Sequence, residues 1–382
     1  MICEKKDCSG CFACYNVCPK KAIEMKEDDF GNIYPVIDEK KCVNCMLCQK
    51  TCPAINNNSK FVSSMDVYAL YNRNNQKRLE SSSGGAACLF YEYILDNNGI
   101  AYGVSNLFTD NFSFIRIEKK EDIMKLKGSK YVHCYINETY KLILKDLKNN
   151  KKVIFIGTPC QVDGLKNFLK KDYLNLYTID IICHGVSSQK LLLDELKLQN
   201  IDFNKINKIY FRNSNLFVLK ILDFDNKVLF EKQADKVSYY KNFLQGNTYR
   251  ENCYSCRYAR KERVSDITIG DYWGLSKESK IYDNDSDGIS LVMINTNKGK
   301  ELFNNIRKEA KYEKRDIKEA IKKNEQLNKP ALKNKKYYIF RDNYKKIGYK
   351  KTNRKMLSFK EKIIFYIKNK PFLYNLLKKI KH

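Results

Sequence analysis

The chain has 382 residues, 43% of them hydrophobic, and a formal net charge of +27. This length and apolar content suffice for a sizeable core divided into two or three compact units, so a disordered chain is excluded. No stretch reaches the roughly 18 uncharged apolar residues of a membrane-spanning helix, and no apolar segment follows the charges at the N-terminus. We therefore expect no export signal and a cytoplasmic location.

The excess of positive charge is uneven along the chain. Residues 330–382 hold 17 Lys and Arg against two acidic residues, a net charge of +15. More than half of the basicity therefore belongs to a tail, which disfavours a nucleic-acid-binding surface on the rest of the protein. The chain also contains 15 cysteines. Because the cytosol keeps thiols reduced, they predict metal sites and not a disulfide framework.

Eight N-terminal cysteines form two copies of the pattern C-x2-C-x2-C-x3-C-P, 34 residues apart. In ferredoxins with this spacing, three thiolates of one copy share a [4Fe-4S] cluster with the fourth thiolate of the other copy. Zinc is the alternative, but zinc sites usually pair two C-x2-C knuckles across a long spacer. The pattern predicts one cluster on Cys8, Cys11, Cys14 and Cys52, and a second on Cys42, Cys45, Cys48 and Cys18.

A turn-like segment, Asp28–Asn32, lies between two apolar runs, Ala22–Met25 and Ile33–Ile37. This pattern predicts a hairpin, as in a compact two-cluster ferredoxin domain over residues 1–56. Such a domain transfers single electrons and performs no bond chemistry on organic molecules, so it requires a redox partner. Cys3 lies outside the repeat and is assigned no role.

After residue 56 the composition becomes that of an α/β body, with a strand expected at Val67–Tyr71. Serines and glycines then precede an apolar helix at about Ala86–Leu95. The N–H groups at such a helix start can bind an anion, although a serine-capped helix that binds nothing fits equally well. A G-x-G-x-x-G fingerprint is absent from the sequence, which disfavours a standard nicotinamide site. In the segment Leu126–Ile136, Lys127, Ser129 and Lys130 place two cations and a hydroxyl around a glycine turn. Such a turn could hold a diphosphate, although an isolated charged turn is more commonly a solvated loop.

Two apolar runs further on, Val153–Ile156 and Leu176–Ile182, enclose a helical pattern at Val162–Leu169. They predict parallel strands of one sheet. Cys160 lies in the turn after the first run, and Cys183 directly follows the second. Both cysteines are therefore expected at the carboxyl edge, where ligands bind in open α/β sheets.

Cys253 and Cys256 form a C-x2-C pair, which suits a redox dithiol, half of a zinc site or half of an iron–sulfur site. With Cys160 and Cys183 they make four thiolates, so we hypothesise a third [4Fe-4S] cluster; with His184 replacing one cysteine, zinc is the competitor. A rival hypothesis makes Cys160 a nucleophile and His184 its base, without an identified orienting residue. Two other cysteines in apolar surroundings are interpreted as inert core thiols: Cys88 and Cys134.

The order of these motifs resembles the beta-subunit family of coenzyme F-420 hydrogenases and dehydrogenases over about residues 1–300. The motifs are the cysteine repeat, SSSGG, KGSKYV, GTPCQVDGLK, DIICHGVSS, RENCYSCRYA, SDITIGDYWG and DGISLVMINT. The resemblance implies an FAD flavoprotein with a [4Fe-4S] cluster beside the isoalloxazine ring. The flavin contacts that it implies are Ser82, Ser83, Gly84, Gly85, Lys127, Ser129, Lys130, Tyr131, Thr158, Pro159 and Gln161. The stretch FRNSNLF departs from the FRDKxxGW of relatives, so the organic substrate does not carry over.

We therefore expect an FAD- and [4Fe-4S]-dependent oxidoreductase. A flavin exchanges hydride with an organic or deazaflavin-type substrate, whereas each cluster carries one electron to a redox partner protein or subunit. The alternative is a non-catalytic electron-transfer subunit of a larger redox complex. No catalytic residue is assigned.

The expected architecture is an α+β ferredoxin-like two-cluster domain, then an α/β flavin-binding body with a mostly parallel or mixed sheet, and a basic helical tail. The ferredoxin-like domain is expected at residues 1–56 and the tail at residues 331–382. The body is expected in two parts, residues 57–150 and residues 151–330 with the third cluster site. In the tail, apolar residues recur at helical spacing from Leu357 to Ile380, interrupted by Pro371. Packing on the body or on a partner subunit is the preferred interpretation, before peripheral contact with the inner membrane face and nucleic acid.

Overall fold

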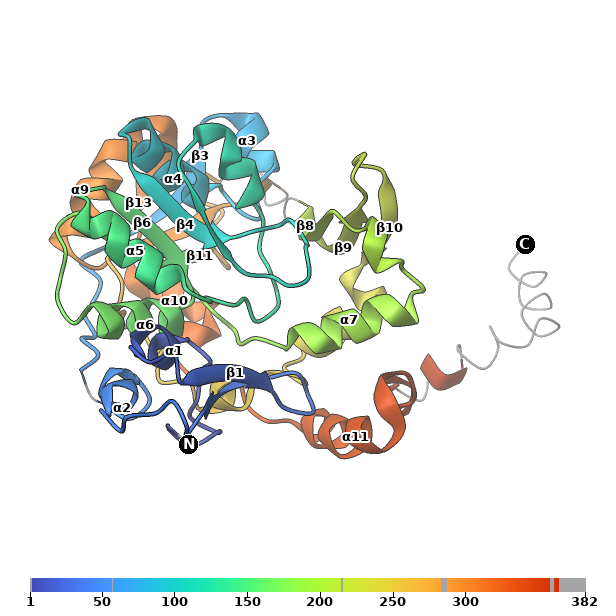
Figure 1. The fold of residues 1–382 in the computed structure, drawn as a ribbon. Helices are drawn as coiled ribbons and strands as arrows, with labels where there is room; N and C mark the ends of the chain where they lie inside the picture. Colours follow the sequence, from blue (N-terminus) through green and yellow to red (C-terminus); the bar gives the residue numbers. More distant parts are fainter. Residues whose placement is uncertain (1, 57, 214–215, 283–286, 358–360, 364–382) are drawn as a thin grey trace, which may run out of the picture.

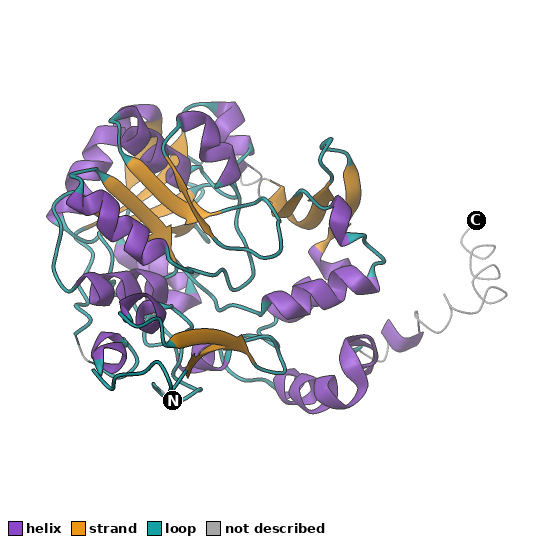
Figure 2. Cartoon of the chain, in the orientation of Figure 1, coloured by secondary structure: helices purple, strands orange, loops and turns teal. Residues whose placement is uncertain are grey.

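The computed structural model describes residues 2–56, 58–213, 216–282, 287–357 and 361–363. The N-terminal segment, blue in Figure 1, contains α1 (Ala13–Val17), α2 (Leu47–Thr51) and the hairpin strands β1 (Ile23–Glu27) and β2 (Ile33–Ile37). It lies beneath the main sheet, next to α6 (Pro159–Leu169). Figure 2 shows that sheet with helices around it, and a smaller sheet to its right.

The 34-residue cysteine repeat is also a repeat of the backbone. Helix α1 follows Phe12 in the left-handed conformation at φ 62°, and α2 follows Met46 at φ 61°. A non-glycine residue at positive φ is uncommon. The recurrence of this state at equivalent positions therefore indicates that both cysteine motifs fold in the same way.

The hairpin predicted between the two motifs is confirmed. Strands β1 and β2 are antiparallel, with Ile23 opposite Ile37 and Glu27 opposite Ile33. In the turn, the Asp28 carboxylate accepts hydrogen bonds from the backbone N–H groups of Phe30 and Asn32, at 2.9 and 2.8 Å. An aspartate that bonds backbone groups beyond it is a common means of closing a turn.

The body contains an eight-stranded mixed sheet in the order β13-β3-β12-β11-β7-β6-β4-β5. Its central pairs β4–β6, β6–β7 and β7–β11 are parallel, and the other pairs are antiparallel. The prediction that the runs before Cys160 and Cys183 form parallel strands is therefore confirmed. The strands are β3 (Asp66–Asn72), β4 (Ile100–Val104), β5 (Phe114–Ile117), β6 (Val153–Gly157), β7 (Leu176–Ile181), β11 (Ile267–Asp271), β12 (Ser290–Ile294) and β13 (Ala310–Lys314).

Both faces of this sheet are covered, which explains why the central strands are continuously apolar. Val153 and Phe155 of β6 belong to one hydrophobic core, which also includes side chains of α5 (Thr139–Lys148) and α6. Ile154 and Ile156 belong to the opposite core, with α4 (Ala86–Asp96) and α9 (Asn297–Ile306). The remaining short helices of the body are α3 (Asn75–Leu79) and α10 (Ile317–Lys322), with 3-10 helices at Lys120–Lys125, Phe203–Lys205, Ala234–Lys236, Glu251–Ser255, Arg307–Glu309 and Glu325–Leu327.

A second sheet, which the sequence analysis did not predict, consists of the antiparallel strands β8 (Lys208–Asn213), β9 (Leu216–Leu222) and β10 (Val228–Gln233). The stretch FRNSNLF spans the end of β8 and the start of β9. This sheet is flanked in sequence by α7 (Gln189–Leu198) and α8 (Ser238–Leu244), and it forms the right side of Figure 1.

The described part of the tail packs on the protein's own surface. Helix α11 (Lys335–Met356) is interrupted at Gly348, which has a φ of 72°. The Tyr344 hydroxyl donates a hydrogen bond to Asp194 of α7 at 2.5 Å, and Tyr349 donates to Glu195 at 2.8 Å. Tyr344 also stacks on Phe30 of the N-terminal hairpin, with ring centroids 5.4 Å apart. The apolar positions predicted from Ile364 to Ile380 lie outside the described residues. In the part of the chain that is described, no helix is long and apolar enough to cross a membrane.

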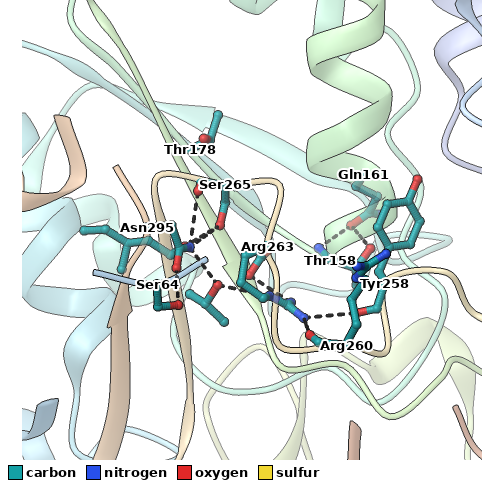
Figure 3. A network of polar contacts seen from close by, with 12 residues as sticks. Ser64, Thr158, Gln161, Thr178, Tyr258, Arg260, Arg263, Ser265 and Asn295 are labelled. Atoms are coloured by element: carbon teal, nitrogen blue, oxygen red, sulfur yellow. Dashed lines mark hydrogen bonds and ion pairs between the residues drawn. The ribbon is translucent and has the colours of Figure 1, made fainter. Parts of the chain in front are cut away.

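A buried polar network connects the loop after Cys256 to the main sheet (Figure 3). Arg263 lies between the group of Ser265 and Asn295 and the group of Tyr258 and Arg260. Its Nη2 atom forms an ion pair with Asp180 of β7 at 3.0 Å, and both side chains are at most 2% exposed. Nη1 donates to the carbonyl oxygens of Tyr258 and Arg260 at 3.0 and 3.1 Å. The network therefore fixes the position of this loop relative to β7.

Removing this guanidinium is expected to destabilise the fold strongly. Arg263→Met leaves the Asp180 carboxylate buried without its counter-charge, so the free energy of unfolding should fall by about 3–5 kcal/mol. Urea unfolding followed by circular dichroism measures the change. Arg260→Met is the control, because Arg260 pairs with Glu262 at the surface and such pairs contribute about 1 kcal/mol or less. The double variant Arg263→Met with Asp180→Asn should regain part of the lost stability. Equal stability of Arg263→Met and Arg260→Met would contradict this role of Arg263.

Candidate functional site

A small cavity in the N-terminal segment is lined by five cysteines: Cys3, Cys8, Cys11, Cys14 and Cys52. The last four are the residues predicted to share one cluster, three from the first motif and one from the second. This is the crosswise arrangement that the paired motif requires. The fifth, Cys3, interacts with Cys8 and Cys52. Sequence reasoning missed this position, because nothing around Cys3 repeats.

The other N-terminal set lies nearer to the surface. Burial raises the pKa of the Cys48 thiol, and Cys18 and Cys42 raise it further by charge repulsion. Cys45 is exposed, whereas Cys18, Cys42 and Cys48 are half-buried. This set therefore combines cysteines from both motifs, as predicted, at a point that a second protein can approach.

The four cysteines of the body converge from separate elements. Cys160 lies in the first turn of α6, where the sequence analysis expected a turn, and Cys183 follows β7. Cys253 and Cys256 lie in and directly after the 3-10 helix Glu251–Ser255. Burial raises the pKa of Cys160 to about 11 and that of Cys183 to about 12, and every pair among the four shows charge repulsion. Four thiols therefore lie together at the edge of the sheet, although the first and the last, Cys160 and Cys256, are 96 residues apart in the sequence.

The arrangement of these thiols bears on which group they can hold. Among the described residues, no three Cys, His, Asp or Glu side chains are placed around a single ion. In a [4Fe-4S] cluster each thiolate binds a different iron, so the ligands surround a cube and not one point.

The rival hypothesis concerns Cys160 and His184. Burial lowers the pKa of His184, and its charged neighbours are Asp271 and Glu325. Cys160 Sγ lies 3.2 Å from Thr158 Oγ1, and a raised pKa is the opposite of what an activated nucleophile requires.

The body set and the buried N-terminal set are neighbours. Gly164, one turn beyond Cys160 in α6, has no side chain, and a Cβ there would lie 3.0 Å from Cys11 Sγ. Cys11 and Cys160 also repel one another electrostatically. The glycine therefore permits the close approach of α1 to α6, which brings the two sets of cysteines together.

A larger cavity of about 400 Å³ opens at the same edge of the sheet. Its volume lies in the range of about 300–1,000 Å³ that is typical of cofactor and ligand sites. Cys183, one of the four converging thiols, lines this cavity. Nine of the eleven residues assigned to flavin contacts also line it: Ser82, Ser83, Gly85, Lys127, Ser129, Lys130, Tyr131, Thr158 and Gln161.

One part of the cavity lining is suited to an anion. Gly85, the N-cap residue directly before α4, is in the left-handed conformation at φ 85°, and no side chain caps the helix. The Ser129 N–H donates to Ser82 Oγ at 2.8 Å and joins the two predicted loops. Burial lowers the pKa of Lys130 to about 7, and its Nζ donates to the carbonyl oxygens of Leu126 and Lys127, both at 2.9 Å. Uncapped N–H groups and a buried amine therefore face the same space.

Gly84 and Pro159 do not line the cavity. A Cβ on Gly84 would lie 2.3 Å from the Leu70 carbonyl oxygen and 2.7 Å from the Ser290 nitrogen, so this glycine allows the loop to pack against the sheet. Pro159 is the first residue of α6, where its missing N–H is no cost. Gly84 therefore allows close backbone packing, and Pro159 starts a helix.

Thr158 and Gln161, which were assigned to ring or substrate atoms, make hydrogen bonds within the protein. The Thr158 hydroxyl and backbone N–H both donate to Gln161 Oε1, each at 3.0 Å. Gln161 Nε2 donates to the Cys134 carbonyl oxygen at 3.0 Å. These bonds cap α6 and hold Cys160 in its first turn.

Another part of the cavity lining is aromatic. Phe217, Phe243 and Tyr249 line it together with Tyr131. The buried Arg212 donates to the Tyr131 hydroxyl at 3.1 Å and pairs with Asp271 at 3.3 Å. Sequence reasoning named Tyr131 but did not place Phe217, Phe243 and Tyr249 at the cavity, because these three come from different segments and share no spaced motif.

The comparisons with known proteins agree with the resemblance drawn from the motifs. Residues 150–320 match the family model for the C terminus of the coenzyme F420 hydrogenase/dehydrogenase beta subunit, and residues 7–56 match a 4Fe-4S dicluster domain. The comparison with curated proteins gave no match. A chain from the xenon-derivatised F420-reducing [NiFe] hydrogenase complex of Methanosarcina barkeri is 17% identical, with a TM-score of 0.46, over 72% of this chain and 97% of that chain. The family model confirms the predicted resemblance over residues 150–320, and the dicluster model confirms the N-terminal ferredoxin-type domain.

Proposed function

We propose that this iron–sulfur protein, related over residues 150–320 to the F420 hydrogenase beta subunit, is an oxidoreductase that couples FAD to three [4Fe-4S] clusters. The observation that carries the proposal is the position of Cys183. It interacts with Cys160 and Cys256 of the converging set, and it also lines the 400 Å³ cavity. A redox group on those thiols would therefore border whatever the cavity binds.

The proposed cluster ligands follow from the three groups of cysteines. The buried N-terminal set and the body set lie against each other at the contact of α1 with α6, and the set with the exposed Cys45 faces outward. Electron transfer between closely spaced clusters needs no further chemistry from the protein. The ligand sets are Cys160, Cys183, Cys253 and Cys256; Cys8, Cys11, Cys14 and Cys52; and Cys42, Cys45, Cys48 and Cys18.

The cavity offers the two environments that FAD requires. The start of α4, Lys127, Ser129 and Lys130 would hold the diphosphate, because they provide N–H donors and cations. The aromatic residues of the lining, of which Tyr249 interacts with Cys183, would exclude water from the ring. When bound, FAD would exchange a hydride with an organic or deazaflavin-type substrate and would exchange single electrons with the clusters.

The outward set suggests where a redox partner protein meets the chain. Val43 and Met46 flank Cys45, and their side chains are 57% and 47% exposed. Apolar residues around a surface redox site are suited to a transient protein contact. The alternative function, a non-catalytic subunit that only relays electrons, uses the same surface but has no use for the large cavity.

Anaerobic reconstitution with iron, sulfide and FAD tests the proposal and its alternative together. We expect about twelve iron atoms per chain, four for each cluster, and one tightly bound FAD. Iron and sulfide are measured by colorimetry, and FAD by its absorbance after release. A protein that binds about eight iron atoms and no FAD would be an electron carrier and would contradict the proposal.

A further inference from the structure

Arg250 lies between the buried N-terminal cysteines and the cysteines of the body, and its side chain is 0% exposed. Its backbone connects it to the body set. The Arg250 N–H donates to the Val186 carbonyl at 2.8 Å, three residues after Cys183, and its own carbonyl accepts from the Cys253 N–H at 3.0 Å. The residue is thus fixed to two of the three segments that carry the proposed third cluster, those of Cys183 and Cys253.

The side chain points the other way, into the N-terminal segment. Nε donates to the Cys8 carbonyl oxygen at 2.8 Å, and Nη2 donates to the Ile33 carbonyl at 2.7 Å and to Cys8 Sγ at 3.5 Å. The guanidinium also lies over the Tyr34 ring, 4.3 Å from its centroid. This one side chain therefore reaches from the body to a thiol of the five-cysteine cavity.

Within the described part of the chain, no carboxylate neutralises the charge of Arg250. Its Nη1 is buried without a hydrogen-bond partner, and no Asp or Glu among the described residues pairs with it. The titratable groups that face it are Cys8, Cys160, Tyr34, Tyr135 and His133. A buried, unpaired cation is costly, and an anionic cluster on the neighbouring thiolates would remove that cost.

We propose that Arg250 is a positioning residue that raises the reduction potential of the cluster on Cys8, Cys11, Cys14 and Cys52. Uptake of one electron adds one negative charge to that cluster, with no bond formed and no proton transferred. A fixed guanidinium that donates to the ligand sulfur stabilises the added charge, since hydrogen bonds and nearby charge set the potentials of such clusters. The cluster nearest to the body is thereby made the favoured acceptor of electrons from the body.

This inference depends on the proposed clusters, and its test uses potentials measured on the reconstituted full chain. Redox titration monitored by EPR should give, for Arg250→Met, one cluster that is at least about tenfold harder to reduce at a fixed potential, a negative shift of about 59 mV or more. The other clusters should change little. Arg250→Lys, which keeps a charge but loses the planar set of donors, should shift the same cluster less.

Arg257→Met is the matched control. Arg257 also connects the body to the N-terminal segment, through the carbonyl oxygens of Pro53 and Asn56, but donates to no sulfur. Unchanged potentials in an iron-replete Arg250→Met protein would overturn the inference. Should Arg250→Met fail to hold iron, Arg250→Lys decides, and an unchanged potential there would also overturn it. Wild-type protein with fewer than eight iron atoms would instead refute the cluster assignment.

Discussion

Cys160→Ala and Cys253→Ala are each expected to lose about four of the twelve iron atoms per chain, because a cluster that lacks one of its four thiolates is not retained. These two residues come from different elements, the first turn of α6 and the 3-10 helix Glu251–Ser255. Loss of about four iron atoms per chain in each variant is the result expected if both side chains bind one cluster. Iron and sulfide analysis after identical reconstitution measures the effect.

The matched control for these variants is Cys88→Ala. Cys88 is also buried, and burial raises its pKa to about 12, close to the value for Cys183. It lies on α4, outside the converging set, and its Sγ contacts Glu92. The Cys88→Ala protein should therefore keep all of its iron. Full iron content in both Cys160→Ala and Cys253→Ala would show that the body holds no cluster, although the N-terminal pair would remain.

The sequence revealed those parts of the site that depend on local spacing. The spacing of the N-terminal cysteines can be read within each copy of the motif. The two copies then adopt the same backbone, with Phe12 and Met46 in the left-handed conformation at equivalent positions. The parallel strands β6 and β7 were predictable because strands buried on both faces are continuously apolar. Their carboxyl ends then placed Cys160 and Cys183 at one edge.

What sequence reasoning missed is set by contacts between distant segments. Arg250 and Cys8 are 242 positions apart, and an isolated arginine carries no periodic signal. The β8–β10 sheet was missed because β10 alternates poorly, with mostly exposed residues, and so lacks the pattern of a strand with one buried face. The aromatic residues Phe217, Phe243 and Tyr249 come together only through that sheet and α8.

Lys130→Met is expected to weaken FAD binding by about thirtyfold or more. The lysine lines the cavity, and removing one partner of a buried charged hydrogen bond costs about 2–5 kcal/mol, where 2 kcal/mol corresponds to about thirtyfold in Kd. Fluorescence titration of the apoflavin protein with FAD measures the change. Lys125→Met is the control, because Lys125 forms an exposed pair with Asp122 outside the cavity.

The same lysine predicts a pH dependence with a definite sign. Burial lowers its pKa to about 7, so in the free protein Lys130 is charged below that pH and neutral above it. A diphosphate binds the charged form better, so FAD binding must take up a proton above pH 7, and Kd should rise by up to about tenfold per pH unit there. Below pH 7 the Kd should be nearly constant, and in Lys130→Met this rise should disappear. A wild-type Kd that stays level between pH 6 and 9, or a Lys130→Met protein with the same profile as wild type, would remove Lys130 from the diphosphate site and leave Lys127, Ser129 and the start of α4 to hold the anion.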